Sequence, residues 1–466
     1  MTAQTSRVNP RSFLYFFAGS LTVILVYVLS GHLPSRESPA AFQAPHTEIL
    51  PDGSEHSFAD TAPGSTQPFE PSHSDSESSS LKTPGITEQE DGWYTDPEEN
   101  PYGAEGVDVS DLLTPEQFAA SNENMKIEHI ELRSQMTKDG KWFTTDFVTQ
   151  NAYNPGFLPH PYKADTWVMF AQRDKNQVGP HDARVFYGPN APYIIYGSQG
   201  PAGSCLGMYI HDLRRLTPSL YNESSGSITS PADPFFWPTD LHRPPPVGGV
   251  EKNWFAFFDM NDEMYLHYDV KPTKRSFAKV NTSDGTVGDD LAPLATTDDK
   301  CMADLMPAYH HNDREWIHQA TNSLSITLCK RSDPSCHPTA DNTFIMLLFQ
   351  TKTFYMHGVY YPYIMLFRRE APFQIHGISQ KPFWFNGRGR MNEFWRWSTW
   401  KPKDQTQMVF TTQMSWAEQG NMYHGYLDDT VILAFGIEDK HGGGLDVKAE
   451  DLLQGMSFCN GGDGES

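Results

Sequence analysis

Residues 343–349 read TFIMLLF, and residues 363–367 read YIMLF. Both runs are short, almost wholly apolar, and rich in β-branched and aromatic side chains. A short run of this composition, bounded by turn residues, predicts a β-strand. The two runs also represent a pattern that recurs along most of the chain.

Six further runs of the same kind lie on either side of these two. They are Thr166–Ala171, Tyr193–Tyr196, Trp254–Phe258, Met264–Tyr268, Met408–Thr412 and Thr430–Phe435. Pro, Gly, Asn and Asp separate them, so the sequence predicts an all-β sandwich, barrel or propeller. A stretch of about 330 residues is too long for one sandwich and suits a propeller of five blades of roughly 60 residues each. We therefore predict a five-bladed β-propeller over residues 136–445.

The N-terminal region has a different composition. Ser12 to Ser30 is a run without a charged side chain. At about 1.5 Å per residue it nearly crosses a hydrocarbon core of roughly 30 Å, which predicts a transmembrane signal anchor over residues 12–30. Arg7 and Arg11 precede the run, so residues 1–11 are expected in the cytosol and the rest across the membrane. A cleaved signal peptide is the alternative, although its apolar region usually runs only about 7–15 residues.

Residues 31–110 are rich in Ser, Pro, Asp and Glu and poor in large apolar side chains. Such a segment cannot bury enough surface to offset its ordering entropy, so we predict a disordered stalk. Thr114–Gln117 (TPEQ) has the pattern of a helix start, which predicts a short helical lead-in over residues 111–135. Residues 446–466 are expected to form a C-terminal tail.

The charge balance limits the partners. The chain has 58 acidic and 35 basic residues, a formal net charge of −23. Nucleic acid is therefore not an expected partner, because phosphate binding needs a basic face. Aromatic residues make up 13% of the chain and fall mainly in the β-rich region.

The cysteines and sequons agree with a location in the secretory pathway. There are five cysteines, at positions 205, 301, 329, 336 and 459. Cys329 and Cys336 bracket a short polar loop and are expected to pair in an oxidising lumen. A zinc site is the alternative, but no CxxC or HxxxH accompanies them. Asn222 and Asn281 begin N-x-Ser/Thr sequons and are predicted glycosylation sites.

Several well-known catalytic motifs are missing from the sequence. It has no GxSxG, HExxH, P-loop, GxGxxG or Asp-x-Asp motif, and we expect no metal site or bound cofactor. Instead, polar residues stand in turns next to the predicted strands; those singled out are Asn154, Asp182, Lys252, Asn253, Asn322 and His424. The ends of the inner strands of a propeller converge on one axis, so residues far apart in sequence can form one site.

The order of these motifs resembles that of a known group of enzymes. The matching motifs are Asn154-Pro155, Asp182-x-Arg184, Ile378-Ser379-x-x-Pro382 and Gly436-Ile437-Glu438-Asp439. In this order they resemble the five-bladed propellers of the β-mannoside phosphorylases and β-1,2-mannosyltransferases, within the furanosidase-like superfamily. Two positions depart from the family pattern, His181 where the family has Glu and Ala183 where it has Pro, and the phosphate-binding set is not matched residue by residue.

The Asp-x-Arg motif suggests a chemistry. Residues two apart on a strand share a face, so Asp182 and Arg184 are both expected to point toward the axis. Arg184 would hold a sugar hydroxyl or an anionic group, while the carboxylate of Asp182 would take a proton during inverting glycosyl transfer. An ion pair that only fixes the turn is the alternative. Asp428 is the second catalytic candidate, with a purely structural turn residue as the alternative.

These observations lead to one main hypothesis and two alternatives. The sequence predicts a type II membrane-anchored glycosyltransferase in the Golgi or another secretory lumen, using a nucleotide-sugar donor and a glycan or small acceptor, with mannose as the expected sugar type. Asn154, Arg184, Lys252, Asn253, Asn322 and His424 are its predicted substrate-binding residues. The first alternative is a glycoside hydrolase or phosphorylase of the same fold. The second is a non-catalytic propeller that binds glycans or proteins.

Overall fold

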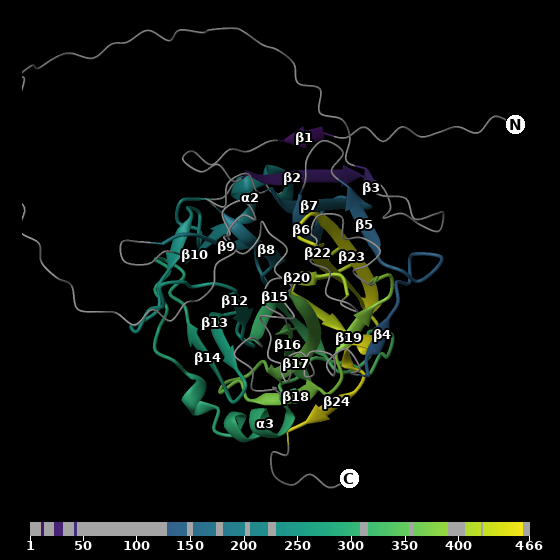
Figure 1. Cartoon of the computed structure of the whole chain (residues 1–466). Helices are drawn as coiled ribbons and strands as arrows, with labels where there is room; N and C mark the ends of the chain where they lie inside the picture. Colours follow the sequence, from purple (N-terminus) through teal and green to yellow (C-terminus); the bar gives the residue numbers. More distant parts are fainter. Residues whose placement is uncertain are drawn as a thin grey trace, which may run out of the picture. The chain divides into compact units, whose positions relative to one another are not determined.

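The computed structural model describes residues 11–13, 23–30, 42–43, 128–146, 152–173, 180–200, 206–221, 230–307, 316–353, 358–389, 406–420 and 423–459. All of them belong to one compact unit of residues 1–46 and 109–466 (Figure 1). The described part of this unit consists mainly of strands, and its longest helix is α3 (Asp298–Leu305).

In the first two sheets, most neighbouring strands are also consecutive in the chain. The first has the order β1 (Arg11–Phe13), β2 (Val23–Ser30), β7 (Thr166–Arg173) and β6 (Tyr153–Pro159). The second has the order β11 (Thr239–Leu241), β10 (Leu206–Asp212), β9 (Pro192–Gln199) and β8 (His181–Tyr187). The short helices α2 (Leu213–Leu216) and η2 (Pro218–Leu220) follow β10.

The third sheet has the strands β12 (Phe255–Phe258), β13 (Met264–Lys271) and β14 (Lys274–Lys279). The fourth has the order β21 (His424–Tyr426), β15 (Trp316–Thr327), β16 (Thr343–Thr353), β17 (Val359–Arg368), β18 (Ile375–Ser379) and β24 (Met456–Phe458). The helices η4 (Ala292–Leu294) and α3 lie in the chain between these two sheets.

The fifth sheet has the order β20 (Val409–Trp416), β22 (Thr430–Ile437), β23 (His441–Lys448), β5 (Phe143–Asp146) and β3 (Phe42–Gln43). The helix η6 (Ala449–Leu453) follows β23. A separate pair, β19 (Phe383–Phe385) and β4 (Ile130–Leu132), runs parallel.

The sheets pack face to face in a closed order. One hydrophobic cluster joins the first and second sheets, a second joins the second, third and fourth, a third joins the fourth and fifth, and a fourth joins the fifth and first. In β16, Ile345, Leu347 and Phe349 face the third sheet, while the alternating residues Met346 and Leu348 face the fifth. The run TFIMLLF is almost wholly apolar because both faces of its strand are buried.

The predicted all-β propeller arrangement is therefore confirmed (Figure 1). All eight strand runs quoted from the sequence form strands in it. Four sheets have four or more strands in the described residues, and the sheet β12–β14, with three, occupies the remaining place in the closed order. The innermost strands are β6, β8, β12, β15 and β20, and packing between several of them draws them around one axis.

The N-terminal region differs from the helix predicted there. Residues 23–30 of the predicted membrane anchor form β2, which pairs antiparallel with β7 from Val23 opposite Arg173 to Ser30 opposite Thr166. Residues 14–22 of the anchor and most of the predicted stalk lie outside the described residues. None of the described helices is long and apolar enough to span a bilayer.

The predicted flanking segments also differ from the structure. Residues 130–132, at the end of the predicted helical lead-in, form strand β4, because backbone pairing with β19 holds them extended. The predicted C-terminal tail belongs to the domain as far as Cys459, since β23 includes residues 446–448 and β24 pairs with β18.

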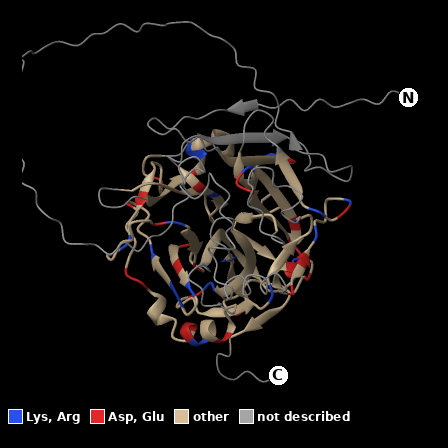
Figure 2. Cartoon of the chain, in the orientation of Figure 1, with Lys and Arg blue, Asp and Glu red and all other residues tan. Residues whose placement is uncertain are grey.

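Two disulfides are present in the described residues. Cys329–Cys336 is the predicted pair. Cys301–Cys459 was not predicted, and it ties α3 to the segment after β24. Cys205 and the sequon residue Asn222 lie outside the described residues, whereas Asn281 is exposed in a turn. In the view of Figure 2, acidic and basic residues are interspersed over the sheets.

Candidate functional site

Three inner strands begin at a residue with left-handed backbone geometry. Asn154 in β6, Asp182 in β8 and Asn253 just before β12 have φ angles of 50°, 49° and 62°. Asn and Asp adopt this region more readily than other non-glycine residues. The ladders of β6 and β8 also shift register at this point. Such irregular geometry costs free energy and concentrates at functional sites, so these strand starts indicate a candidate functional site.

Asn154 and Asp182 meet across the first and second sheets. The Nδ2 of Asn154 donates to Oδ1 of Asp182 at 3.3 Å. The backbone N–H of Asp182 donates to Oε1 of Gln172 at 2.9 Å, which fixes the turn. Asn154 is buried, whereas Asp182 is half-buried. The carboxylate is therefore oriented by an amide and still reachable.

Arg184 is buried beneath this pair and is 1% exposed. Its Nη1 donates to the backbone oxygen of Asp182 at 2.9 Å, its Nη2 to Oδ1 of Asn253 at 2.9 Å, and its Nε to the backbone oxygen of Ala320 at 2.8 Å. Burial lowers the pKa of Arg184, and the charge of Asp182 opposes that change. Arg184 thus joins the second, third and fourth sheets, and its predicted contact with substrate gives way to a positioning role.

Two further glutamines continue this arrangement. The Nε2 of Gln319 donates to the backbone oxygen of Asn253 at 3.2 Å. In the fourth sheet, Oε1 of Gln350 accepts a bond of 3.1 Å from the backbone N–H of Thr411 in β20. Both glutamines are buried. They extend the network from the third sheet through the fourth to the fifth.

The fifth sheet closes on the first at Gly436. A Cβ atom at this position would lie 2.2 Å from Oδ1 of Asn154, so only glycine leaves room for the amide. We call the residues linked in this way the polar ring. They are Asn154, Asp182, Arg184, Asn253, Gln319, Gln350 and Thr411.

Positive charge lies beside the polar ring. Lys252 is exposed, and Lys352 is half-buried. Burial, and then the charge of Lys252, lowers the pKa of Lys352 to about 8, although Asp439 opposes the change. Burial, followed by the charges of Lys352, Lys252 and Arg184, lowers the pKa of His318 to about 3. The imidazole is therefore neutral at pH 7 and lies within a positive potential that favours anions.

Asn322, predicted to bind substrate, is fully buried away from this site. Its Nδ2 donates to the backbone oxygens of Met414 and Ser323, and its Oδ1 accepts from the backbone N–H of Met414. The side chain therefore fixes β20 to β15, and its polar groups are used within the protein.

His424 and Asp428 belong to the opposite ends of the inner strands. His424 pairs with Ser325 in β15. Because β15 bulges after Gln319, the partner strand advances only from Phe349 to Ile345 between Gln319 and Ser325, which is about 13 Å along the sheet. Its ring nitrogens bond to the hydroxyls of Ser325 and Thr327, and burial lowers its pKa to about 4. The predicted grouping of His424 with Asp182 therefore gives way to a separate location.

Asp428 fixes a loop. Its carboxylate accepts from the backbone N–H groups of Arg331 and Ser332 at 2.6 and 3.1 Å. Desolvation alone would raise the pKa of Asp428, but the bonds from Ser332 and Arg331 lower it to about 2. The next residue, Asp429, holds the Arg331 guanidinium at 2.5 and 2.8 Å. These contacts agree with the turn role that the sequence left as the alternative for Asp428.

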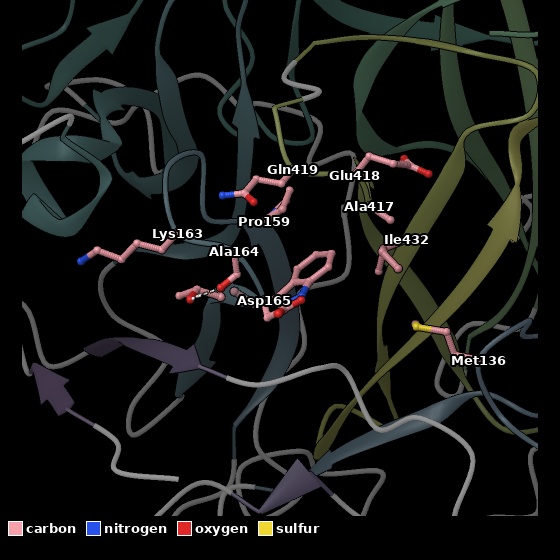
Figure 3. Close-up of a pocket in the computed structure, with 11 residues that line it drawn as sticks. Met136, Pro159, Lys163, Ala164, Asp165, Ala417, Glu418, Gln419 and Ile432 are labelled. Carbon is pink, nitrogen blue, oxygen red and sulfur yellow. Dashed lines mark hydrogen bonds between the residues drawn. The ribbon is translucent and has the colours of Figure 1, made fainter. Parts of the chain in front are cut away.

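Two pockets lie away from the polar ring. One, of about 350 Å³, is lined by Pro189, Asp262, Arg331, Arg369, Gly420, Tyr423, His424 and Tyr426. The other, of about 460 Å³, lies where β6 ends and β7 begins, beside the end of β20 (Figure 3). Figure 3 labels Lys163, Asp165 and Glu418 around it, and Trp167 and Ile432 also line it. None of the predicted catalytic residues lines either pocket.

No group of three or more His, Cys, Asp or Glu side chains in the described residues has the arrangement of a metal site. The sequence did not single out Gln319, Gln350, Lys352 or Thr411. Each of them lies near the start of an inner strand, or opposite one, in the same position along the axis as Asn154. Aligning the starts of the predicted inner strands was the one signal that would have indicated them.

Comparisons with known proteins give only distant matches. No family model matches the chain, and no curated protein matches it. Among solved structures, a mannose phosphorylase from Leishmania mexicana in complex with phosphate ion has a TM-score of 0.34 and 12% identity, covering 74% of this chain and 95% of its own. A GDP-Man-dependent mannosyltransferase from the same organism has a TM-score of 0.33 and 11% identity, covering 73% and 96%.

A β-1,2-mannobiose phosphorylase from Listeria innocua has a TM-score of 0.32 and 13% identity, covering 61% of this chain and 65% of its own. Glycosyl hydrolases are also among the matches, for instance one from Bacteroides ovatus with a TM-score of 0.30 and 10% identity, covering 65% and 85%. Likenesses this low transfer neither a reaction nor a substrate to this chain.

Proposed function

We propose that this protein transfers glycosyl groups, with the polar ring as its active site and Asp182 as the proton acceptor. The observation that carries the proposal is the carboxylate of Asp182, half-buried and oriented by Asn154 while Arg184 fixes its backbone. The sequence resemblance supports it, because Asp182-x-Arg184 matches the second-blade motif of the mannoside-active propellers.

The proposed reaction is a single displacement. The acceptor oxygen forms a bond to the anomeric carbon of the donor while the bond from that carbon to the leaving oxygen breaks. Asp182 takes the proton of the acceptor hydroxyl, and the leaving group departs with the bonding electrons as a phosphate or nucleoside diphosphate. Lys252 and Lys352, beside the ring, supply positive charge for that leaving group. One displacement inverts the anomeric centre.

Two alternatives receive less support. Hydrolysis with two carboxylates needs a second acid about 5–9.5 Å from the first, and the second carboxylate predicted from the sequence, Asp428, lies toward the opposite ends of the inner strands. A binding propeller without catalysis would have Asp182 enclosed in a buried ion pair. Arg184 instead bonds to the backbone oxygen of Asp182, and the carboxylate is half-buried.

The proposal can be tested with the full chain in detergent. It is incubated with a panel of nucleotide sugars and sugar 1-phosphates, including mannose donors, and with oligosaccharide acceptors, and the released leaving group is measured. We expect turnover with at least one donor and its loss in Asp182→Asn. Asp428→Asn is the matched control and is expected to keep the wild-type rate. Equal rates in wild type and Asp182→Asn would remove Asp182 from catalysis.

We also propose a location in the secretory pathway, with the domain in the Golgi or another lumen. Two disulfides support an oxidising compartment. The type II anchor at residues 12–30 and glycosylation of Asn222 and Asn281 remain predictions from sequence. Alkaline carbonate extraction and a glycosidase mobility shift of the expressed full chain test them. Release by carbonate would exclude the anchor.

A further inference from the structure

Beside the polar ring, between the fourth and fifth sheets, lies a set of six neighbouring residues that we call the His318 recess. They are His318, Gln350, Lys352, Tyr360, Phe410 and Thr411. His318 in β15 lies opposite Gln350 in β16, and Lys352 lies opposite Tyr360 in β17. Paired residues of neighbouring strands point to the same face of a sheet, so these four share one face.

Aromatic rings form one wall of the recess. The rings of His318 and Tyr360 have centroids 5.9 Å apart, and those of Tyr360 and Phe410 are 5.1 Å apart. His318, Lys352, Tyr360 and Phe410 are all half-buried, so this wall is partly open to solvent. The Nζ of Lys352 lies 5.7 Å from the centroid of Tyr360.

Polar atoms without a partner lie at the base. Gln350 and Thr411 are fully buried. The Nε2 of Gln350, the Oγ1 of Thr411 and the Nε2 of His318 bond to nothing in the described part of the chain. The oxygen of the Gln350 amide is occupied by the backbone N–H of Thr411, which leaves its NH₂ group to donate elsewhere. Buried polar groups nearly always have partners, and these three belong to neighbouring residues, since His318 pairs with Gln350 and the backbone N–H of Thr411 bonds to it.

We propose that the His318 recess binds one sugar ring of the substrate through its hydroxyl groups, with the ring face against Tyr360 or Phe410. This inference rests on the proposed glycosyl transfer. The bound sugar ring would belong to the part of the substrate that extends from Asp182 toward the fifth sheet. Gln350 donates to a hydroxyl oxygen, and Thr411 either donates or accepts. Neutral His318 has one nitrogen that donates and one that accepts, which suits a hydroxyl group.

Aromatic rings beside a few polar groups are the usual composition of a site for a small polar ligand. An anion would accept a hydrogen bond from the NH₂ group of Gln350 but would make no apolar contact with the rings of Tyr360 and Phe410. The recess thus combines groups suited to a neutral sugar ring with the positive charge of Lys352, which is also proposed to act on the leaving group.

The test uses two neighbouring threonines. Thr411→Val removes a hydroxyl that has no partner in the described residues, so folding is expected to be unaffected. Thr412→Val is the matched control, because its hydroxyl donates to the backbone oxygens of Pro155 and Ala434 at 2.8 and 3.2 Å. Binding of methyl α-D-mannopyranoside, methyl α-D-glucopyranoside and methyl α-D-galactopyranoside to each full-length variant is measured by saturation-transfer NMR, with thermal melting in parallel.

We expect Thr411→Val to weaken binding of the preferred glycoside about fivefold and to raise the KM of one substrate similarly, with kcat and the melting temperature close to wild type. Thr412→Val is expected to lower the melting temperature and to leave glycoside affinity unchanged. If the wild-type protein turns over a donor and Thr411→Val shows unchanged glycoside affinity and KM, the proposed sugar binding in the recess would be wrong, while the proposed function would stand. A wild-type protein that neither turns over a donor nor binds any glycoside would overturn both.

Discussion

Asn154 and Asp182 lie 28 residues apart in the chain, and each begins an inner strand with a φ angle near 50°. The Nδ2 of one lies 3.3 Å from Oδ1 of the other. The amide cannot move away freely, since Gly436 is packed against its oxygen. Two irregular backbone positions in different sheets thus fix the direction of one carboxylate.

Asn154→Gly tests whether this contact orients Asp182. Glycine tolerates the positive φ, so the variant removes the amide without backbone strain. We expect kcat to fall about tenfold to a hundredfold, because a small misplacement of a reacting group is costly. The melting temperature should change little. Glycosyl transfer under saturating donor and thermal melting are the measurements.

Asp165→Gly is the control for this substitution. Asp165 also has a positive φ, of 51°, but it is exposed in the turn between β6 and β7. It should keep the wild-type kcat. If Asn154→Gly also retained full activity, the contact with Asp182 would have no role in orienting the carboxylate.

Arg184 is expected to contribute more to stability than to substrate contact. Its three bonds reach two backbone oxygens and Asn253, and a lysine cannot reproduce this planar fork. Arg184→Lys should lower the free energy of unfolding by about 2–4 kcal/mol, since it leaves buried acceptors without donors. Urea denaturation measures the change.

Lys252→Ala provides the comparison for Arg184. Lys252 is exposed, so this variant should stay within about 0.5 kcal/mol of wild-type stability. It should instead raise the KM of an anionic donor. A stable Arg184→Lys protein with only a raised KM would show that Arg184 binds substrate after all.

Much of the fold follows from local sequence pattern. TFIMLLF predicted a strand, and in the structure this strand packs between the third and fifth sheets with both faces buried. Asn154 and Asp182 were predicted to converge, because turn residues before inner strands share one end of a propeller axis. This part was predictable since it depends on strand period and turn chemistry alone.

Other features depend on contacts between distant segments. Cys301 and Cys459 pair across a separation of 158 residues, and no spacing rule indicates such a pair. Asn322 and Asp428 have residue types suited to a site, yet their bonds to Met414 and Arg331 show that they stabilise strands and loops. No sequence motif marks Gln350 as a site residue, because its contact with Thr411 forms only when the fourth and fifth sheets pack.

The charge of Lys352 predicts a pH dependence. Burial and Lys252 lower its pKa to about 8, so the ammonium is present at pH 7 and falls to about one tenth at pH 9. The KM for an anionic donor should therefore rise several-fold between pH 7 and pH 9. Steady-state kinetics across this range, with a neutral glycoside as reference ligand, test the expectation.

Lys352→Arg is the control for the pH dependence. A guanidinium remains charged at pH 9, so the rise in KM should disappear in this variant. A rise of the same size in Lys352→Arg would assign the titration to another group.

The two disulfides should differ in their contributions to stability. Cys301–Cys459 closes a separation of 158 residues, whereas Cys329–Cys336 closes one of 7. In the chain-entropy account the longer loop restricts the unfolded chain more, so its loss should cost about 5 kcal/mol and loss of the shorter about 2.5 kcal/mol. The double variants Cys301→Ser/Cys459→Ser and Cys329→Ser/Cys336→Ser are compared by guanidinium denaturation without reductant. Equal midpoints would contradict this reasoning and indicate that native contacts of α3 with β18 already hold the C-terminal segment in place.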